Sequence, residues 1–144
     1  MKHIEVAISQ LDKQEVPRGS NWGPDVKGYL GSVGINFPAS WCMAFVYWCV
    51  KTSGIVNPLI KTGGCIAQWN KIDKKYKKSE PLAGDIFIQD HGHGLGHTGI
   101  VEKVQGDKIF TIEGNTNDTG SREGYEVCRR VRDIKSCIGF IRII

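Results

Sequence analysis

The sequence lacks both a secretory signal and a membrane-spanning run at its N-terminus. The opening segment, MKHIEVAISQLDKQEV, places Glu5, Asp12 and Glu15 within its apolar pattern, whereas a signal peptide or a spanning helix needs a continuous apolar stretch. We therefore expect a chain that is synthesised in the cytoplasm and has no membrane span. We also find no internal repeat, linker or low-complexity segment, so residues 1–144 are expected to form a single domain.

The five cysteines include no CxxC pair of the kind that binds zinc. Their odd number leaves at least one thiol without a disulfide partner within the chain. Cys42 and Cys49 lie seven residues apart on one expected helix, about 10 Å along its axis, which is too far for a disulfide. Cys128 and Cys137 would face each other across a hairpin, although a reducing compartment would keep them as thiols.

A strong excess of charge of one sign is also missing. The chain has 19 Lys and Arg against 15 Asp and Glu, a net charge of +4, which permits an anionic partner but does not require one. The basic residues are dispersed and the aromatic residues fall mainly at core positions, which argues against a nucleic-acid binder. The densest basic run, residues 74–80, is expected to form a solvated rim, with a substrate-facing role as the alternative.

Hydrophobic spacing divides the chain into helices followed by strands. Apolar residues at helical spacing predict helices at residues 3–13, 24–33, 40–54 and 66–72. Short β-branched segments separated by turn signals then predict antiparallel strands at residues 86–88, 98–104, 108–113, 126–131 and 138–143. This order is typical of an α+β fold.

The most apolar of the expected helices begins beside a cysteine. Trp41–Val50 carries no charge, and Pro38 and Ser40 before it and Gly54 after it indicate a buried helix with Ser40 as its N-cap. Cys42 would then lie in the first turn, where unpaired N–H groups and the helix dipole favour a thiolate. The dipole contributes only about 0.3–1 kcal/mol, so Cys42 needs a charged partner to act as a nucleophile. Without one it is an ordinary buried cysteine.

Three of the four histidines lie in the segment HGHGLGHTGIV and allow two interpretations. In the first, His91, His93 and His97 hold zinc, with Cys42 or Asp90 as a fourth ligand. Against this, their spacing matches no standard zinc pattern and the glycines favour a floppy loop. In the second, His97 acts alone, because it stands where the glycine-rich loop ends and a strand begins.

A hairpin through residues 105–107 returns the next strand beside His97. Antiparallel pairing brings Glu113 opposite position 98 or 99, and Asn115 projects to the same face two residues later. A carboxylate or amide there would accept Nδ1–H of His97 and leave Nε2 for the nucleophile. This predicts a Cys–His–acid constellation. The alternatives are a surface strand end for Glu113 and an Asx turn for Asn115.

Four segments resemble, in order, the successive motifs of the CHAP family, the cysteine, histidine-dependent amidohydrolases and peptidases: WCMAFVYWC, PLAGDIFI, GHTGIVEKV and IEGNTN. The family is related to NlpC-like cell-wall hydrolases. The resemblance implies a papain-like fold, in which N-terminal helices pack on an antiparallel sheet. The leading segment, AISQLDKQEVPRGSNWGPDVKGYL, is similar to the entry segment of phage-type members.

The resemblance implies that Cys42 is the nucleophile, His97 the general base and then acid, Glu113 the orienting acid and Asn115 a further polar member. It implies hydrolysis of an amide bond in peptidoglycan, next to the lactyl group or within the stem peptides, and no cofactor. Some relatives bind calcium through acidic residues before the cysteine. Because no Asp or Glu lies between Asp25 and Cys42, we expect no calcium requirement.

An enzyme of this kind without a signal peptide would reach the wall through a holin during phage lysis or by injection through a secretion system. In the second case an immunity protein that blocks the Cys42 cleft is an expected partner. The alternatives are a non-catalytic module that binds wall peptides or another protein, and the zinc hydrolase. Trp41 and Trp22 are expected to line a groove for glycan or peptide, and Phe45 and Trp48 to pack in the core.

Overall fold

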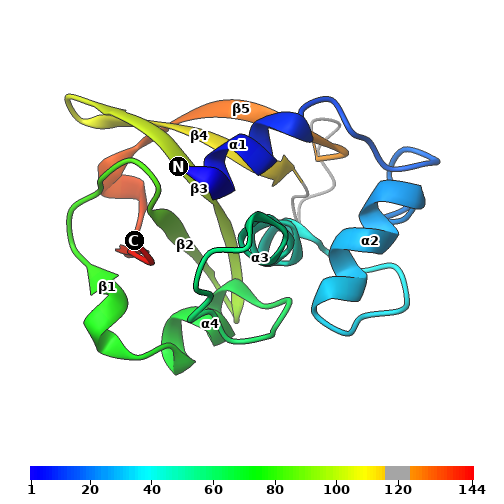
Figure 1. Cartoon of the computed structure of the whole chain (residues 1–144), viewed down its shortest axis with the longest axis horizontal. Coiled ribbons are helices and arrows are strands. Elements are labelled where there is room, and N and C mark those ends of the chain that lie inside the picture. The colour runs from blue at the N-terminus through cyan, green and yellow to red at the C-terminus, as the bar shows by residue number, and fades with distance from the viewer. Residues whose placement is uncertain (116–123) are drawn as a thin grey trace.

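The computed structural model describes residues 1–115 and 124–144, which form helices and one antiparallel sheet (Figure 1). The helices precede nearly all of the strands, which confirms the predicted α+β class. The helical elements are α1 (Lys2–Ser9), α2 (Pro24–Ser32), α3 (Cys42–Ser53), α4 (Cys65–Lys71) and the 3-10 turns η1 (Lys74–Tyr76) and η2 (Ile134–Ser136). The strands are β1 (Lys77–Lys78), β2 (Ile86–Gly92), β3 (Leu95–Gln105), β4 (Lys108–Asn115), β5 (Glu126–Asp133) and β6 (Gly139–Ile141).

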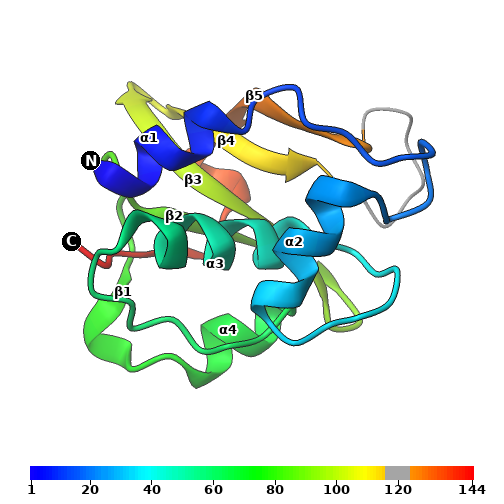
Figure 2. The same ribbon diagram turned by 45° about the vertical axis from the view of Figure 1, so that its right-hand side comes forward.

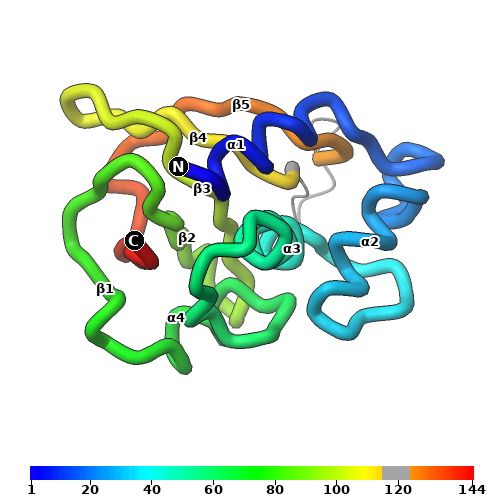
Figure 3. The backbone as a smooth tube through the Cα atoms, in the orientation of Figure 1, coloured from blue at the N-terminus to red at the C-terminus, as the bar shows by residue number. Residues whose placement is uncertain are grey.

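The sheet has six strands in the order β1-β6-β2-β3-β4-β5. Strands β2 to β5 follow one another as neighbours, whereas the last strand, β6, lies between β1 and β2. The backbone tube in Figure 3 follows this return, with the C-terminal end close to β1 and β2. All strand pairs are antiparallel, as predicted.

Helix α3 lies at the centre of the molecule. It contacts α1, α2, β3 and β4, and Figure 2 shows it running lengthwise between α1 and α4. Successive strand residues point to opposite faces, so Ile86, Ile100 and Ile112 join the helices in one core while Phe87 and Val101 belong to a second, smaller cluster. Because α3 is surrounded by packed elements, the position of its first residue is well defined.

Two predicted elements have different bounds for identifiable reasons. The helix predicted over residues 3–13 ends at Ser9, because the backbone of Asp12, Lys13 and Glu15 hydrogen-bonds to Tyr125 and Val127 instead. The glycine-rich loop is an ordered part of the β2–β3 hairpin, with φ of 57° at His93 and 76° at Gly94. Two consecutive residues in the left-handed region fit the tight turns that join such strands. The strands on both sides are therefore longer than predicted.

Two further differences lie at the β1 end of the sheet. β6 spans three residues, Gly139–Ile141, where six were predicted. The basic run at residues 74–80 contributes η1 and the edge strand β1, which pairs with β6. None of the helices in the described ranges has the length and apolar character needed to cross a bilayer.

Candidate active site

Cys42 is the first residue of α3, and Trp41, not the predicted Ser40, is the N-cap residue. The Ser40 prediction is wrong because burial of Trp41 fixes where the helix starts. The Trp41 indole is fully buried, stacks on Tyr29 with ring centroids 5.6 Å apart, and donates its N–H to Glu15 Oε2 at 2.7 Å. Cys42 nevertheless occupies the predicted first turn, and its side chain is only 5% exposed.

His97 is the third residue of β3 and is brought beside both Cys42 and Glu113. Its Nε2 lies 2.7 Å from Oε1 of Glu113, and its ring lies close enough to Cys42 for each side chain to shift the pKa of the other. The predicted use of the two ring nitrogens is therefore wrong, since Nε2 contacts the acid and Nδ1 remains for the thiol. The physical reason is that Glu113 lies beside position 99, two residues further along β3, and approaches the ring from that side.

Glu113 on β4 is fully buried, and a glycine on the neighbouring strand makes room for it. The register Ile100↔Ile112 continues to place Gly99 opposite Glu113, within the predicted window. A Cβ at Gly99 would lie 2.7 Å from Cγ of Glu113 and 2.7 Å from the ring of Phe87. Any larger residue at position 99 would therefore push the carboxylate away from His97.

Arg132 and Thr111, which the sequence analysis missed, complete the surroundings of the carboxylate. Arg132 donates Nε–H to Glu113 Oε2 at 2.9 Å and a second N–H to Oε1 at 2.6 Å. Thr111 donates its hydroxyl to Oε2 at 2.6 Å. With His97 on Oε1, both oxygens of a buried charge have charge-assisted partners, which is the condition under which such a charge is tolerated.

This network favours the charged form of every member. Burial opposes the charge on Glu113, but hydrogen bonds from Arg132 and His97 outweigh it and lower its pKa to about 2. Burial also opposes the charge on His97, but hydrogen bonds to Cys42 and Glu113 raise its pKa to about 9. A hydrogen bond from Cys65, followed by the hydrogen bond and charge of His97, holds the pKa of Cys42 well below its usual value. The pair therefore exists as thiolate and imidazolium near neutral pH.

Cys65, the first residue of α4, is the second neighbour of the Cys42 sulfur that the sequence analysis missed. The two Sγ atoms lie 3.4 Å apart, and Cys65 is 6% exposed. A Cβ at Gly96 would lie 3.3 Å from Cβ of Cys65, so the absence of a side chain there lets α4 approach the start of β3. The site thus contains two cysteines side by side.

The other two histidines of the predicted segment are not brought to the centre. His91 and His93 are exposed on the β2–β3 hairpin, and His91 contacts Gln89 at 3.3 Å. Within residues 1–115 and 124–144 no three metal-ligating side chains lie close enough to hold an ion, so the zinc interpretation has no support in this part of the chain. Asn115 is the last residue of β4, opposite Glu126, but its side chain lies outside the described residues.

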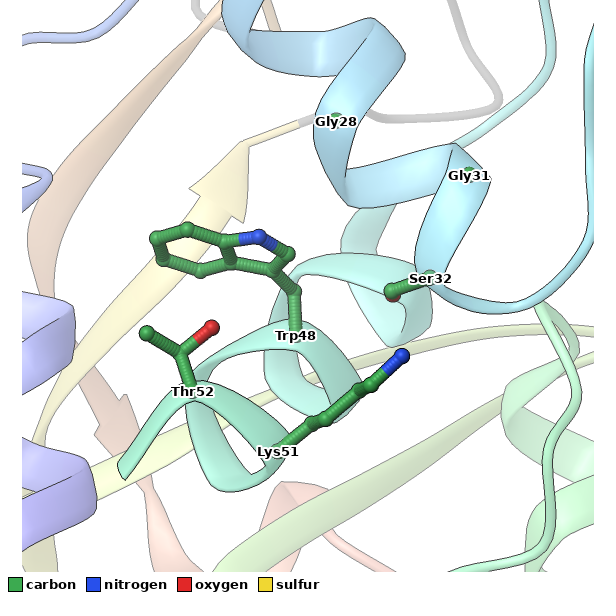
Figure 4. A pocket seen from close by; sticks show the side chains of 6 residues that line it. All are labelled: Gly28, Gly31, Ser32, Trp48, Lys51 and Thr52. Carbon is green, nitrogen blue, oxygen red and sulfur yellow. The ribbon is translucent and has the colours of Figure 1, made fainter. Parts of the chain in front are cut away.

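Only one of the two tryptophans expected to line a groove can do so. Trp41 is fully buried and cannot line one, whereas Trp22 is half-buried and its groove-lining role stays a prediction. Phe45 and Trp48 both pack with the core as predicted, Trp48 edge-on against Tyr29. Trp48 also borders a groove of about 380 Å³ between α2 and α3 (Figure 4). The other lining residues are Gly28, Gly31, Ser32, Lys51 and Thr52.

The buried contact between Glu15 and Trp41 leads to a stability prediction. Replacing Glu15 with alanine leaves the Trp41 indole N–H and the backbone N–H of Gly19, which Glu15 also accepts at 2.8 Å, without their acceptor. Gly19 is exposed, so water can replace its acceptor, but the Trp41 indole is fully buried. An unpaired buried donor costs about 1–3 kcal/mol, so the free energy of unfolding should fall by about that amount in a denaturant titration. Glu80→Ala, at an exposed position, is the matched control. Equal stability of the two variants would contradict the anchoring role of Glu15.

A cysteine at the start of a central helix, facing a histidine on an antiparallel sheet, is the papain-like arrangement, and the fold is of this kind as predicted. Residues 34–115 match the family model of the CHAP domain. The matched segment is more than half of the chain and contains Cys42, His97 and Glu113. The chain belongs to the CHAP family.

Two crystal structures of Ly7917 are similar to this chain. The structure of Ly7917 with the hydrolyzing product of MDP has a TM-score of 0.56 and 14% sequence identity, and the match covers 98% of this chain and 61% of that one. The structure described as Ly7917 alone has a TM-score of 0.48 and 17% identity over 70% of this chain and 52% of that one. This chain therefore spans about three fifths of the length of the protein it matches. No curated protein matches the chain.

Proposed function

We propose that this protein is a peptidoglycan hydrolase that cleaves an amide bond with Cys42 as the nucleophile. The observation that carries the proposal is the placement of Cys42 at the start of α3 beside His97, whose Nε2 lies 2.7 Å from the buried carboxylate of Glu113. The lowered pKa of Cys42 and the raised pKa of His97 agree with this arrangement. Membership of the CHAP family supports a hydrolase of this type. The similar structure of Ly7917 contains the hydrolyzing product of MDP, which supports a substrate of the same class.

The geometry suits attack on a carbonyl carbon. The Cys42 thiolate adds to the carbonyl of the scissile amide, and the negative charge that develops on oxygen lies near the unpaired N–H groups at the start of α3. His97 then donates its Nδ1 proton to the departing amine, which leaves an acyl group on the Cys42 sulfur. Next, His97 accepts a proton from water, and the water hydrolyses the thioester and restores the thiolate.

Glu113 serves this cycle by holding the ring of His97. Its Oε1 fixes Nε2, so Nδ1 stays directed at the sulfur in both the charged and the neutral state. Arg132 and Thr111 in turn hold the carboxylate. Asn115 as a further polar member, and delivery to the wall through a holin or a secretion system with an immunity protein, stay predictions.

Digestion of purified peptidoglycan tests the proposed function. We expect soluble fragments with new amino termini, identified by amine labelling and mass spectrometry: an alanine terminus for cleavage next to the lactyl group, an internal residue for cleavage within the stem peptide. A chelator should leave the release unchanged, because the mechanism uses no metal. Prior treatment with iodoacetamide should abolish it, with the alkyl group mapped to Cys42.

Three other outcomes would each contradict the proposed function in a different way. Binding to peptidoglycan without any new terminus, from a wild-type sample with a reactive Cys42, would indicate the non-catalytic module. Release that a chelator abolishes and added zinc restores would indicate a metal hydrolase. Release that persists after full alkylation of Cys42 would exclude this residue as the nucleophile.

A further inference from the structure

The Cys42 sulfur lies next to a second group that can be oxidised, the thiol of Cys65. The Sγ atoms of Cys42 and Cys65 lie 3.4 Å apart, and both residues are reduced. A disulfide has an S–S distance of about 2.05 Å, so the two sulfurs are roughly 1.4 Å further apart than in the bonded state. Rotation of the two side chains about their Cα–Cβ bonds can supply a displacement of this size without separating the helices that carry them.

The position of Cys65 is fixed by its surroundings. α4 contacts β2 and β3, and Gln68 within it accepts a hydrogen bond from Ile60 N at 2.8 Å and donates one to Ile60 O at 2.7 Å. This pair ties the segment before α4 to the helix itself. Helix α3 is also held by its neighbours α1, α2, β3 and β4. The two sulfurs are therefore kept next to each other by the fold.

The electrostatics of the pair suit stepwise oxidation. Cys42 is kept as a thiolate by Cys65 and His97, and the thiolate is the form of cysteine that reacts with peroxides. Cys49 cannot resolve the product, because it is buried seven residues further along α3, about 10 Å away. Cys65 is the thiol already in contact with the sulfur that would be oxidised. Both sulfurs are only slightly exposed, which restricts the oxidant to a small molecule.

We propose that Cys65 is a resolving cysteine that converts Cys42 reversibly into a disulfide when the protein meets a peroxide. In the first step the Cys42 thiolate attacks one peroxide oxygen, the O–O bond breaks, and Cys42 becomes a sulfenic acid while hydroxide leaves and takes a proton to form water. In the second step the Cys65 sulfur attacks the Cys42 sulfur, the S–O bond breaks, and the thiol proton leaves with the hydroxyl as a second water. Hydrogen peroxide is reduced and two thiols are oxidised, so electrons balance.

The disulfide would act as a reversible off state of the site. It removes the nucleophile, and it also protects Cys42 from further oxidation to sulfinic acid, which thiol reductants do not reverse. A dithiol reductant would restore the thiolate by exchange. The formation of the disulfide is independent of the proposed function, whereas the loss of hydrolysis rests on it.

The experiment treats the reduced full-length protein with hydrogen peroxide and maps its peptides by mass spectrometry. For wild type we expect a Cys42–Cys65 linked peptide, loss of peptidoglycan release, and recovery of nearly all of the release after dithiothreitol. Cys65→Ser retains a hydrogen-bond donor beside Cys42 but cannot form the disulfide. After the same treatment it should carry sulfinic or sulfonic acid at Cys42 and stay inactive with dithiothreitol. Cys137→Ser is the control variant, because the Cys137 thiol hydrogen-bonds to Ser136 and to the Asp133 carbonyl. Its response to peroxide and to dithiothreitol should match that of wild type.

Two results would overturn the proposal. One is peroxide-treated wild type in which Cys42 is oxidised but no Cys42–Cys65 peptide forms. The other is a Cys65→Ser variant that recovers with dithiothreitol as fully as wild type. A linked peptide in a protein that releases nothing from peptidoglycan in its reduced state would instead retain the thiol pair and reject the proposed function.

Discussion

Replacing Cys42 with alanine is expected to lower the rate of amide cleavage by about 10⁴-fold or more, the range seen when a nucleophile is removed from a catalytic unit. Alanine has the highest helix propensity, so α3 should still form and the variant should remain folded. Release of new amino termini from peptidoglycan measures the rate, and circular dichroism provides the folding control. A folded variant with wild-type activity would reject the assignment of Cys42.

The same variant makes a second measurement possible, at His97. In wild type the pKa of His97 is raised to about 9, after the opposing effect of burial, by its hydrogen bonds to Cys42 and Glu113. Removal of the thiolate takes away the first of these, so the His97 pKa should fall in Cys42→Ala, as followed by NMR of the ring protons. An unchanged pKa would mean that the two side chains do not form an ion pair.

The pH dependence of the wild type follows from the same values. Because the pKa of folded His97 is above its ordinary value of 6.5, its charge contributes stability that is fully present below about pH 6.5 and is lost as the pH rises through about 9. Cleavage should decline over the same alkaline range, since the neutral ring has no proton for the leaving amine. On the acidic side the lowered pKa of Cys42 keeps the thiolate available at a lower pH than for an ordinary cysteine.

The three central residues were predictable because local rules position each of them. The uncharged run after Pro38 and before Gly54 defined a buried helix around Cys42, and the turn at Gly106 returned β4 beside β3. A one-residue register shift between Val101 and Lys103 then sets which residues of the two strands face each other near the site. Register across a short hairpin decides which residues face each other. The hairpin therefore predicted that Glu113 would lie near His97, whereas the exact register also depends on the shift between Val101 and Lys103.

The features that the sequence analysis missed depend on long-range packing. Arg132 lies opposite Ile109 in the register of β4 and β5, and Cys128 lies opposite Glu113. Arg132 reaches the carboxylate only because its long side chain extends along the sheet to Glu113. Cys65 meets Cys42 only because of the path taken by residues 54–64, which carry no periodic pattern. The N-cap at Trp41 and the choice of Nε2 for Glu113 depend on how buried side chains fit together. Residue spacing contains no information on such contacts.

Replacement of Arg132 is expected to cost a large amount of stability. Its two hydrogen bonds compensate a carboxylate that is fully buried, and removing one partner of a buried pair costs about 3–5 kcal/mol. We therefore expect Arg132→Met to lower the free energy of unfolding by that amount in a denaturant titration at neutral pH. Methionine keeps an unbranched side chain of similar length, so the loss reports mainly on the charge.

The same strand supplies a matched control. Arg129 also pairs with a glutamate, Glu102, through two hydrogen bonds of 3.0 and 3.2 Å, but both side chains are partly exposed. An ion pair of this kind contributes at most about 1 kcal/mol. Arg129→Met should therefore leave stability nearly unchanged, and similar losses in the two variants would show that burial of Glu113 is not what makes Arg132 important.

The dependence of stability on pH under acidic conditions shows whether Arg132 stabilises the protein through its charge or through its packing. The pKa of Glu113 is lowered to about 2 because, against the effect of burial, Arg132 and His97 hydrogen-bond to it. Its contribution to stability is therefore present above the ordinary value of about 4.5 and is lost as the pH falls through about 2. Without Arg132 the folded-state pKa rises, so Arg132→Met should begin to lose stability at a higher pH than wild type on acidification. A uniform loss at all pH values would instead indicate that Arg132 acts through packing alone.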